Sequence, residues 1–133
     1  MNRERIVIIC PGRGSYTRDT QGYLNKYIKS SSNEIKYMDD ERNNAGLPTL
    51  TEIDSQKFKS SVHMKGEHAS TLIYACSLLD YYSIDQSKYK IVAILGNSMG
   101  WYSTLAFSKS NKVSSQYSFK TGGQMISFPP GSC

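Results

Sequence analysis

Two short apolar segments, at residues 6–10 and 91–95, stand out in a chain that is otherwise rich in polar residues. Their apolar residues follow one another without polar residues between them, which is typical of strands buried on both faces of a parallel sheet. We therefore predict strands at 5–10 and 90–95. Each is followed directly by a glycine-containing segment, which should end the strand in a turn.

Helical periodicity is clearest between residues 67 and 82. Apolar residues recur there with the spacing i, i+3, i+4, i+7 and i+10, namely Ala69, Leu72, Ile73, Cys76 and Leu79. This spacing predicts an amphipathic helix. Shorter helices are expected near 21–29 and from about 100 to 107, each after a glycine-containing segment. The order strand, turn, helix favours an α/β fold with a parallel sheet.

The remaining segments are mostly polar. Residues 34–66 are predicted to lie on the surface, with at most short helices around 39–44 and 52–58. Residues 108–133 are rich in serine and glycine and are predicted to be weakly structured. We therefore divide the chain into an α/β part at 1–107 and a C-terminal segment at 108–133.

The composition is that of one ordinary globular domain, with 133 residues of which 38% are hydrophobic and 20% charged. No apolar run exceeds five residues, whereas roughly 20 are needed to cross a bilayer. These runs are also shorter than the core of a signal peptide. We expect a cytoplasmic protein that does not bind membranes. The three scattered cysteines form no C-x-x-C pair, so neither a zinc site nor a disulfide framework is expected.

The charge is distributed unevenly, because no acidic residue follows Asp85. Up to that position the chain has 11 basic and 11 acidic residues, and five lysines follow it, which accounts for the net charge of +5. These lysines are dispersed and are not joined by arginines, so we expect no nucleic-acid binding. An excess of positive charge suits an acidic protein partner or a phosphate-bearing ligand.

The residues after the second strand, Gly96-Asn97-Ser98-Met99-Gly100, fit the pattern G-x-S-x-G. In a nucleophile elbow, a serine stands on a sharp turn between a strand and a helix, and the two glycines avoid a steric clash. Ser98 would then be the nucleophile, and the backbone N–H of Met99 would face the oxyanion. The pattern alone is weak, but the predicted strand and helix supply the context that an elbow requires. The alternative is an ordinary strand-to-helix turn.

The residues after the first strand, Pro11-Gly12-Arg13-Gly14-Ser15, also connect a strand to a predicted helix. They lack the G-K-[ST] of a P-loop, and Thr17 occupies the third glycine position of a dinucleotide-binding fingerprint. Two interpretations remain open. The segment is either a tight turn without a chemical role, or a second source of an oxyanion donor through the backbone N–H of Arg13.

Together, P-G-R-G-S at 11–15 and G-N-S-M-G-W-Y-S-T-L at 96–105 resemble the malonyl-CoA:acyl carrier protein transacylase family. The segment at 69–76 is similar to the helix that precedes the elbow strand in that family. The resemblance covers about residues 6–107. It implies a three-layer α/β fold, with a mostly parallel sheet and helices on both faces.

The resemblance also implies a reaction. Ser98 would take an acyl group, malonyl in this family, from a CoA thioester and pass it to the phosphopantetheine thiol of an acyl carrier protein, as in fatty acid or polyketide synthesis. The carrier protein would be the partner, with no metal or redox cofactor. The other implied site residues are the oxyanion donors Met99 and Arg13, the elbow glycines Gly96 and Gly100, and the substrate-proximal Asn97 and Trp101.

Two departures concern the acyl group. Asn97 and Trp101 stand where the family commonly has histidine and a charged residue. The family also holds the malonyl carboxylate with an arginine after the elbow, whereas the last arginine of this chain is Arg42. The sequence therefore does not specify which acyl group is transferred.

The largest departure concerns the catalytic base. A serine nucleophile needs an imidazole to remove its proton, and the family places that histidine well after the serine. Here both histidines precede Ser98. We interpret His68 as a helix-start residue and His63 as a surface residue, and not as a metal pair. The chain thus resembles the N-terminal part of an acyltransferase, and we expect it to be nearly inactive alone.

Two alternative functions fit the same motifs. A serine esterase or hydrolase fragment would use the same elbow with water as the acceptor. A non-catalytic carrier-binding module would keep the two loops without the catalytic machinery.

Overall fold

The computed structural model describes residues 2–28, 32–109, 118–121 and 124–127. Within them, β1 (Glu4–Cys10) and β2 (Tyr89–Gly96) form a parallel pair. The structure adds a short antiparallel pair, β3 (Ser118–Thr121) with β4 (Gln124–Ser127). Six α-helices and a short 3-10 helix complete this mixed α/β structure: η1 (Arg13–Ser15), α1 (Tyr23–Tyr27), α2 (Ser32–Asn44), α3 (Leu50–Ser55), α4 (Ser60–His63), α5 (Gly66–Ser83) and α6 (Gly100–Lys109).

The parallel pairing of β1 and β2 confirms the two predicted strands. The register joins Ile6 to Ile91 and Cys10 to Gly96, with an irregularity after Ile6. The prediction that both faces of these strands are buried is wrong for the described structure. Ile8 and Ile94 pack against the core, whereas Val7, which precedes Ile8 and points to the other face, is exposed.

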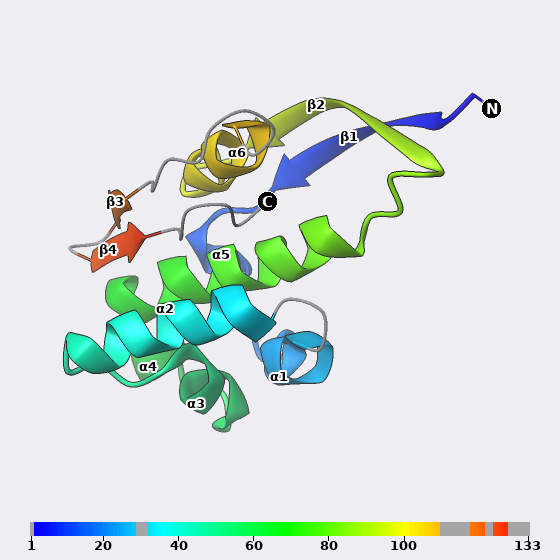
Figure 1. Cartoon of the computed structure of the whole chain (residues 1–133). Coiled ribbons are helices and arrows are strands. Elements are labelled where there is room, and N and C mark those ends of the chain that lie inside the picture. The colour runs from blue at the N-terminus through cyan, green and yellow to red at the C-terminus, as the bar shows by residue number, and fades with distance from the viewer. Residues whose placement is uncertain (1, 29–31, 110–117, 122–123, 128–133) are drawn as a thin grey trace.

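Helix α5 lies in the centre of the molecule, with β1, β2 and α6 on one side and helices α1 to α4 on the other (Figure 1). Its existence confirms the predicted helix. Its amphipathic character is not confirmed, because every residue from His68 to Leu79 is buried. Ser70 and Thr71 lie outside the apolar stripe, so they were expected to be exposed. Neighbouring elements cover this side of the helix too, and both residues are buried.

The segment between α1 and α5 is not a surface stretch, contrary to the prediction. Helix α2 buries Ile35, helix α3 buries Leu50 and Ile53, and helix α4 buries His63. Helix α3 starts in a capping box, in which the Thr49 hydroxyl accepts from the Glu52 N–H and the Glu52 carboxylate accepts from the Thr49 N–H. The few apolar residues of this segment are widely spaced, so helical periodicity does not reveal them.

The β3–β4 pair lies in the segment that was predicted to be weakly structured. The remainder of that segment, at 110–117, 122–123 and 128–133, lies outside the described residues. A signal was available, because Gly122-Gly123 between two short runs is typical of a hairpin. Among the helices that the structure describes, none is long and apolar enough to cross a bilayer.

Candidate active site

Ser98 has a backbone conformation that is rare for a residue with a side chain. Its φ angle is 52°, in the left-handed region, and no other non-glycine residue in the described ranges has a positive φ. The left-handed region costs L-residues on the order of 1 kcal/mol or more, and such strain persists only where surrounding contacts impose it. Ser98 is also exposed, between the last residue of β2 and the first residue of α6.

The two glycines around Ser98 make this turn possible. A Cβ on Gly96 would lie 2.5 Å from the carbonyl carbon and oxygen of Gly100. A Cβ on Gly100 would lie 2.1 Å from the carbonyl oxygen of Cys10 and 2.9 Å from that of Pro11. Both separations are too short for any side chain, so the turn requires glycine at each position. This is the geometric reason for the spacing G-x-S-x-G.

The loop after β1 lies directly beside the turn that carries Ser98. The Asn97 N–H donates to the Cys10 carbonyl at 3.1 Å, which joins the carboxyl ends of the two strands. A Cβ built on Gly12 would lie 3.5 Å from the Cβ of Ser98 and 3.2 Å from the carbonyl oxygen of Asn97. The structure therefore brings together the two loops that the sequence singled out.

The backbone N–H groups of Met99 and Arg13 are free to donate. In the turn, the N–H groups of Gly100 and Trp101 donate to the carbonyls of Asn97 and Ser98 at 2.8 and 3.1 Å. Neither the Met99 N–H nor the Arg13 N–H donates to another group in the described part of the chain. The Met99 side chain is buried while the Arg13 side chain is exposed. No other acceptor in the described residues therefore competes for these two N–H groups, as an oxyanion hole requires.

The two substrate-proximal candidates also lie near the turn. Asn97 is exposed, and its amide nitrogen would lie 3.5 Å from a Cβ on Gly12. Trp101 is exposed in the first turn of α6. A large exposed indole next to a nucleophile offers an apolar surface to a substrate chain.

Neither histidine is available as a base for Ser98. His63 is fully buried, so its prediction as a surface residue is wrong. Its Nδ1 pairs with the Lys59 backbone, accepting from the N–H at 3.1 Å, and its Nε2 contacts the Ile53 carbonyl at 2.9 Å. The ring thus connects the backbone of α3 to the residue that precedes α4, and it stacks on Tyr16. The spacing of apolar residues could not predict that His63 is buried, because a helix of four residues is too short to show a periodic pattern.

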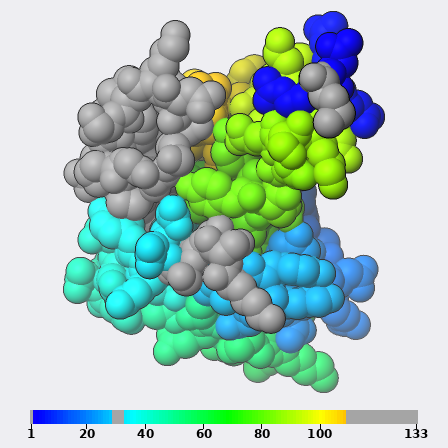
Figure 2. All heavy atoms as spheres, turned by 45° about the vertical axis from the view of Figure 1, so that its right-hand side comes forward, coloured from blue at the N-terminus to red at the C-terminus, as the bar shows by residue number. Residues whose placement is uncertain are grey.

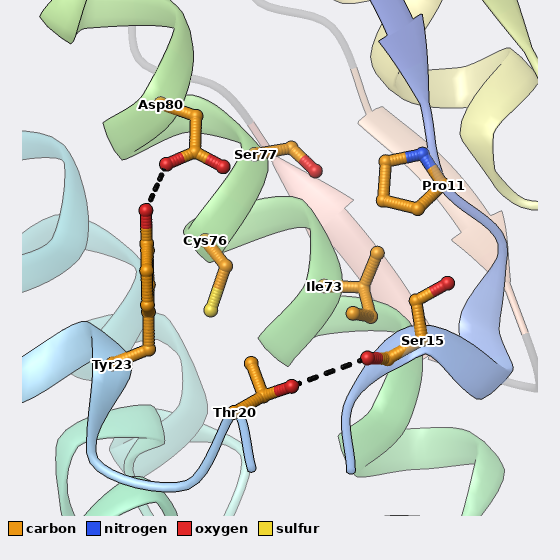
Figure 3. A pocket seen from close by; sticks show the side chains of 8 residues that line it. All are labelled: Pro11, Ser15, Thr20, Tyr23, Ile73, Cys76, Ser77 and Asp80. Atoms are coloured by element: carbon orange, nitrogen blue, oxygen red, sulfur yellow. Dashed lines mark hydrogen bonds between the residues drawn. The ribbon is translucent and has the colours of Figure 1, made fainter.

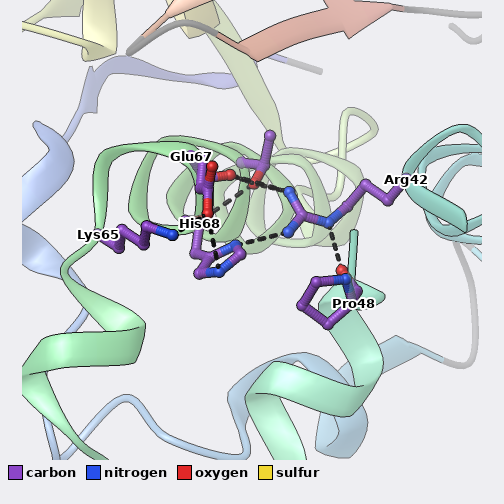
Figure 4. A network of polar contacts seen from close by, with 6 residues as sticks. Arg42, Pro48, Lys65, Glu67 and His68 are labelled. Carbon is purple, nitrogen blue, oxygen red and sulfur yellow. Dashed lines mark hydrogen bonds and ion pairs between the residues drawn. The ribbon is translucent and has the colours of Figure 1, made fainter. Parts of the chain in front are cut away.

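His68 does lie in the first turn of α5, as predicted, but it is buried in a polar network with Arg42 (Figure 4). The Arg42 Nη2 donates to the His68 Nδ1 at 2.7 Å, which requires a neutral imidazole with its proton on Nε2. Burial, together with the adjacent guanidinium, lowers the pKa of His68. Nδ1 is therefore occupied, and the ring connects α2 to α5 rather than serving the elbow.

Arg42 cannot bind an acyl carboxylate either. Its side chain is 3% exposed, and its remaining donors reach the carbonyls of Pro48 and Glu67 at 2.7 and 2.9 Å and the hydroxyl of Thr71 at 3.0 Å. Burial lowers its pKa, which Asp39 and Glu67 counteract. Four of the five N–H donors of the guanidinium thus connect the end of α2 to Pro48 and to the start of α5.

The buried thiols are not alternative nucleophiles. Cys10 and Cys76 are both buried and unbridged. Burial raises the pKa of Cys10, and burial together with the nearby Asp54 and Asp80 raises the pKa of Cys76 to about 12. Because the thiolate is the reactive form, both groups are inert near neutral pH.

A cavity of about 160 Å³ lies between α5 and the loop after β1 (Figure 3). A second cavity of about 190 Å³ shares Pro11, Ser77 and Asp80 with it. The Tyr23 hydroxyl donates to Asp80, and this bond raises the pKa of Tyr23. Ser98 lines neither cavity. The Ser98 residue itself is exposed.

No group of three or more potential metal ligands occurs in the part of the chain that the structure describes. The chain matches no family model, no curated protein and no solved structure at a significant level. The resemblance to the transacylase family therefore rests on the motif residues at 11–15 and 96–105 and on the helix segment at 69–76.

Proposed function

We propose that the protein is an acyltransferase that moves an acyl group from CoA to the phosphopantetheine thiol of an acyl carrier protein. The observation that carries the proposal is the position of Ser98, exposed in a left-handed conformation beside the loop that contains Gly12. A serine fixed in this way at the end of a parallel strand matches the elbow used for acyl transfer. The motif resemblance favours malonyl as the acyl group, and CoA substrates favour a cytoplasmic location.

The proposed reaction has two steps. The Ser98 Oγ attacks the thioester carbonyl carbon, and the negative charge that develops on the carbonyl oxygen is stabilised by the N–H groups of Met99 and Arg13. The C–S bond then breaks, CoA leaves as a thiol with the proton of Ser98, and an acyl ester remains on the enzyme. The carrier thiol attacks this ester, and its proton returns to Ser98.

The proton transfers need a base that His63 and His68 do not supply, because their contacts occupy them elsewhere. Loss of a triad base typically lowers the rate on the order of 10⁴-fold or more. We therefore expect slow acylation of Ser98 by the chain alone, and faster acylation when an imidazole is added in solution.

Intact-protein mass spectrometry after incubation with malonyl-CoA and with acetyl-CoA tests this function. We expect a single acyl adduct that maps to Ser98, is absent in Ser98→Ala and persists in the matched control Ser61→Ala, an exposed serine on α4. Release of the acyl group to water faster than to a pantetheine thiol would favour the hydrolase instead.

The second candidate is a non-catalytic carrier-binding module. The absence of an available histidine near Ser98 within the described residues favours it. Carrier binding that is unchanged in Ser98→Ala, together with no adduct on the unmodified protein even with imidazole, would support this alternative.

A further inference from the structure

One face of the β1–β2 pair carries large apolar side chains that are exposed in the described structure. Val7, Ile9 and Leu95 are 51%, 71% and 52% exposed, and all lie on the face opposite the core-facing Ile8 and Ile94. Parallel sheets are normally buried on both faces, usually beneath helices. Contiguous exposed apolar side chains of this kind mark interaction surfaces.

The amino-terminal end of this face is basic. Arg5 and Lys90 are register partners on the two strands, and alternation along β1 places Arg5 on the face of Val7 and Ile9. The extra residue of β2 at the register irregularity after Ile6 keeps Lys90 on this face as well. Both side chains are exposed, and neither forms an ion pair in the described structure. Figure 2 shows the amino-terminal ends of the two strands side by side at the molecular surface.

Two like charges in register on neighbouring strands oppose folding, because their repulsion is not relieved by a carboxylate. An acidic group from a partner would remove this cost. Lys65 and Lys88, in contrast, pair with Glu67 and Asp85 within the chain. The pair Arg5 and Lys90 is therefore suited to an external anion.

The opposite end of the same face leads to the candidate nucleophile. From Lys90 to Gly96 the strand advances six residues, about 20 Å at the rise of a β-strand. Exposed Asn97 and Ser98 follow directly. A partner on this face would thus have its acidic groups near Arg5 and Lys90. A flexible group of the same partner could then reach along the strands towards Ser98.

We propose that this outer sheet face, made of Arg5, Val7, Ile9, Lys90 and Leu95, is the docking surface for the acyl carrier protein. The inference rests on the proposed function, in which the carrier accepts the acyl group. An acidic helix with an apolar stripe is complementary to this face. Its carboxylates can pair with the two cations, and its apolar stripe can cover the apolar side chains.

Binding of a fluorescently labelled holo-acyl carrier protein to the full chain tests the proposal, with fluorescence anisotropy as the readout. All variants carry Ser98→Ala, so that no acyl transfer occurs. We expect Arg5→Gln with Lys90→Gln, and separately Val7→Thr with Ile9→Thr, to weaken binding about tenfold or more. The matched control, Lys57→Gln with Lys59→Gln, alters exposed lysines outside the sheet and should change the affinity less than twofold.

Circular dichroism establishes that each variant keeps the folded structure, and the threonines retain β-branched side chains for that purpose. Equal loss of affinity in the control pair, or no binding of the carrier to the starting protein, overturns the proposal. A dimer of the chain alone that Val7→Thr with Ile9→Thr dissociates, seen by analytical ultracentrifugation, also overturns it in favour of a second copy.

The acyl adduct on Ser98 is measured separately and reports on the proposed function alone. An adduct without carrier binding to the outer sheet face would leave the function in place and refute the docking surface. Carrier binding to this face without any adduct would support the docking surface and refute the acyltransferase function.

Discussion

Gly12 lies against Ser98, although the two residues are far apart in the sequence. A Cβ on Gly12 would approach the Ser98 Cβ to 3.5 Å and the Asn97 carbonyl oxygen to 3.2 Å. The contact exists because β1 and β2 are parallel neighbours, so the loops that follow them leave the same edge of the sheet. In open α/β sheets, ligands bind at this carboxyl edge.

Gly12→Ala should slow acylation of Ser98 more than it affects stability. The added methyl group would press on the Asn97 carbonyl and move the Arg13 N–H away from the oxyanion position. We expect the acylation rate to fall by about tenfold to a hundredfold, since loss of an oxyanion donor has effects of this order or larger. Adduct formation followed by mass spectrometry measures it. Gly14→Ala is the matched control, because a Cβ there meets no atom within 4 Å; equal slowing in both variants would contradict the prediction.

Gly100→Ala should destabilise the fold itself. The new Cβ would lie 2.1 Å from the Cys10 carbonyl oxygen, which is backbone and cannot rotate away. We expect the free energy of unfolding to fall by about 3 kcal/mol, the upper part of the range for overpacking. Urea denaturation followed by circular dichroism measures the change. A loss no greater than that of Gly14→Ala would show that the turn differs from the one described.

Arg42→Met should be strongly destabilising. The substitution leaves the Nδ1 of buried His68 and the carbonyl of Pro48 without the donors that reach them, each at 2.7 Å. We expect a loss of about 3 kcal/mol, because unsatisfied buried polar groups each cost about 1 to 3 kcal/mol. Chemical denaturation gives the value. Arg18→Lys, at an exposed position, should change stability by less than about 0.5 kcal/mol, and a similar loss in both variants would be the contrary result.

His68 should make the fold less stable in mild acid. Its pKa is lowered from the ordinary value of 6.5, first by burial and then by Arg42. The unfolded chain therefore binds a proton in a range where the folded chain does not, so stability is lost as the pH falls from 6.5 towards the lowered value. Glu67 raises the pKa of His68 in part, and Lys65 lowers it further.

His68→Gln separates this effect from the titration of carboxylates, because glutamine keeps an acceptor for Arg42 and has no proton to gain. The stability of the unmodified protein relative to this variant should decline between pH 8 and pH 5, measured by denaturation at each pH. Parallel pH profiles for the two proteins would contradict the prediction.

The candidate site was largely visible in the sequence, because an elbow depends on local geometry. Gly96 and Gly100 stand on either side of Ser98 at the spacing that close backbone contact requires, and the structure shows that contact. The roles of Met99 and Arg13 as oxyanion donors stay predictions, since they depend on a reaction. The burial of His63 and His68 could not be predicted, because their partners come from other segments of the chain.

The sequence by itself determined the local order of strand, glycine turn and helix at 4–15 and 89–109, because β-branched runs and glycines act on the backbone where they stand. Only the tertiary structure decided that polar residues between α1 and α5 are buried and that the outer face of the β1–β2 pair stays exposed. Both outcomes depend on which distant segments pack together. The free energy of such packing belongs to the pair of surfaces and not to either sequence pattern alone.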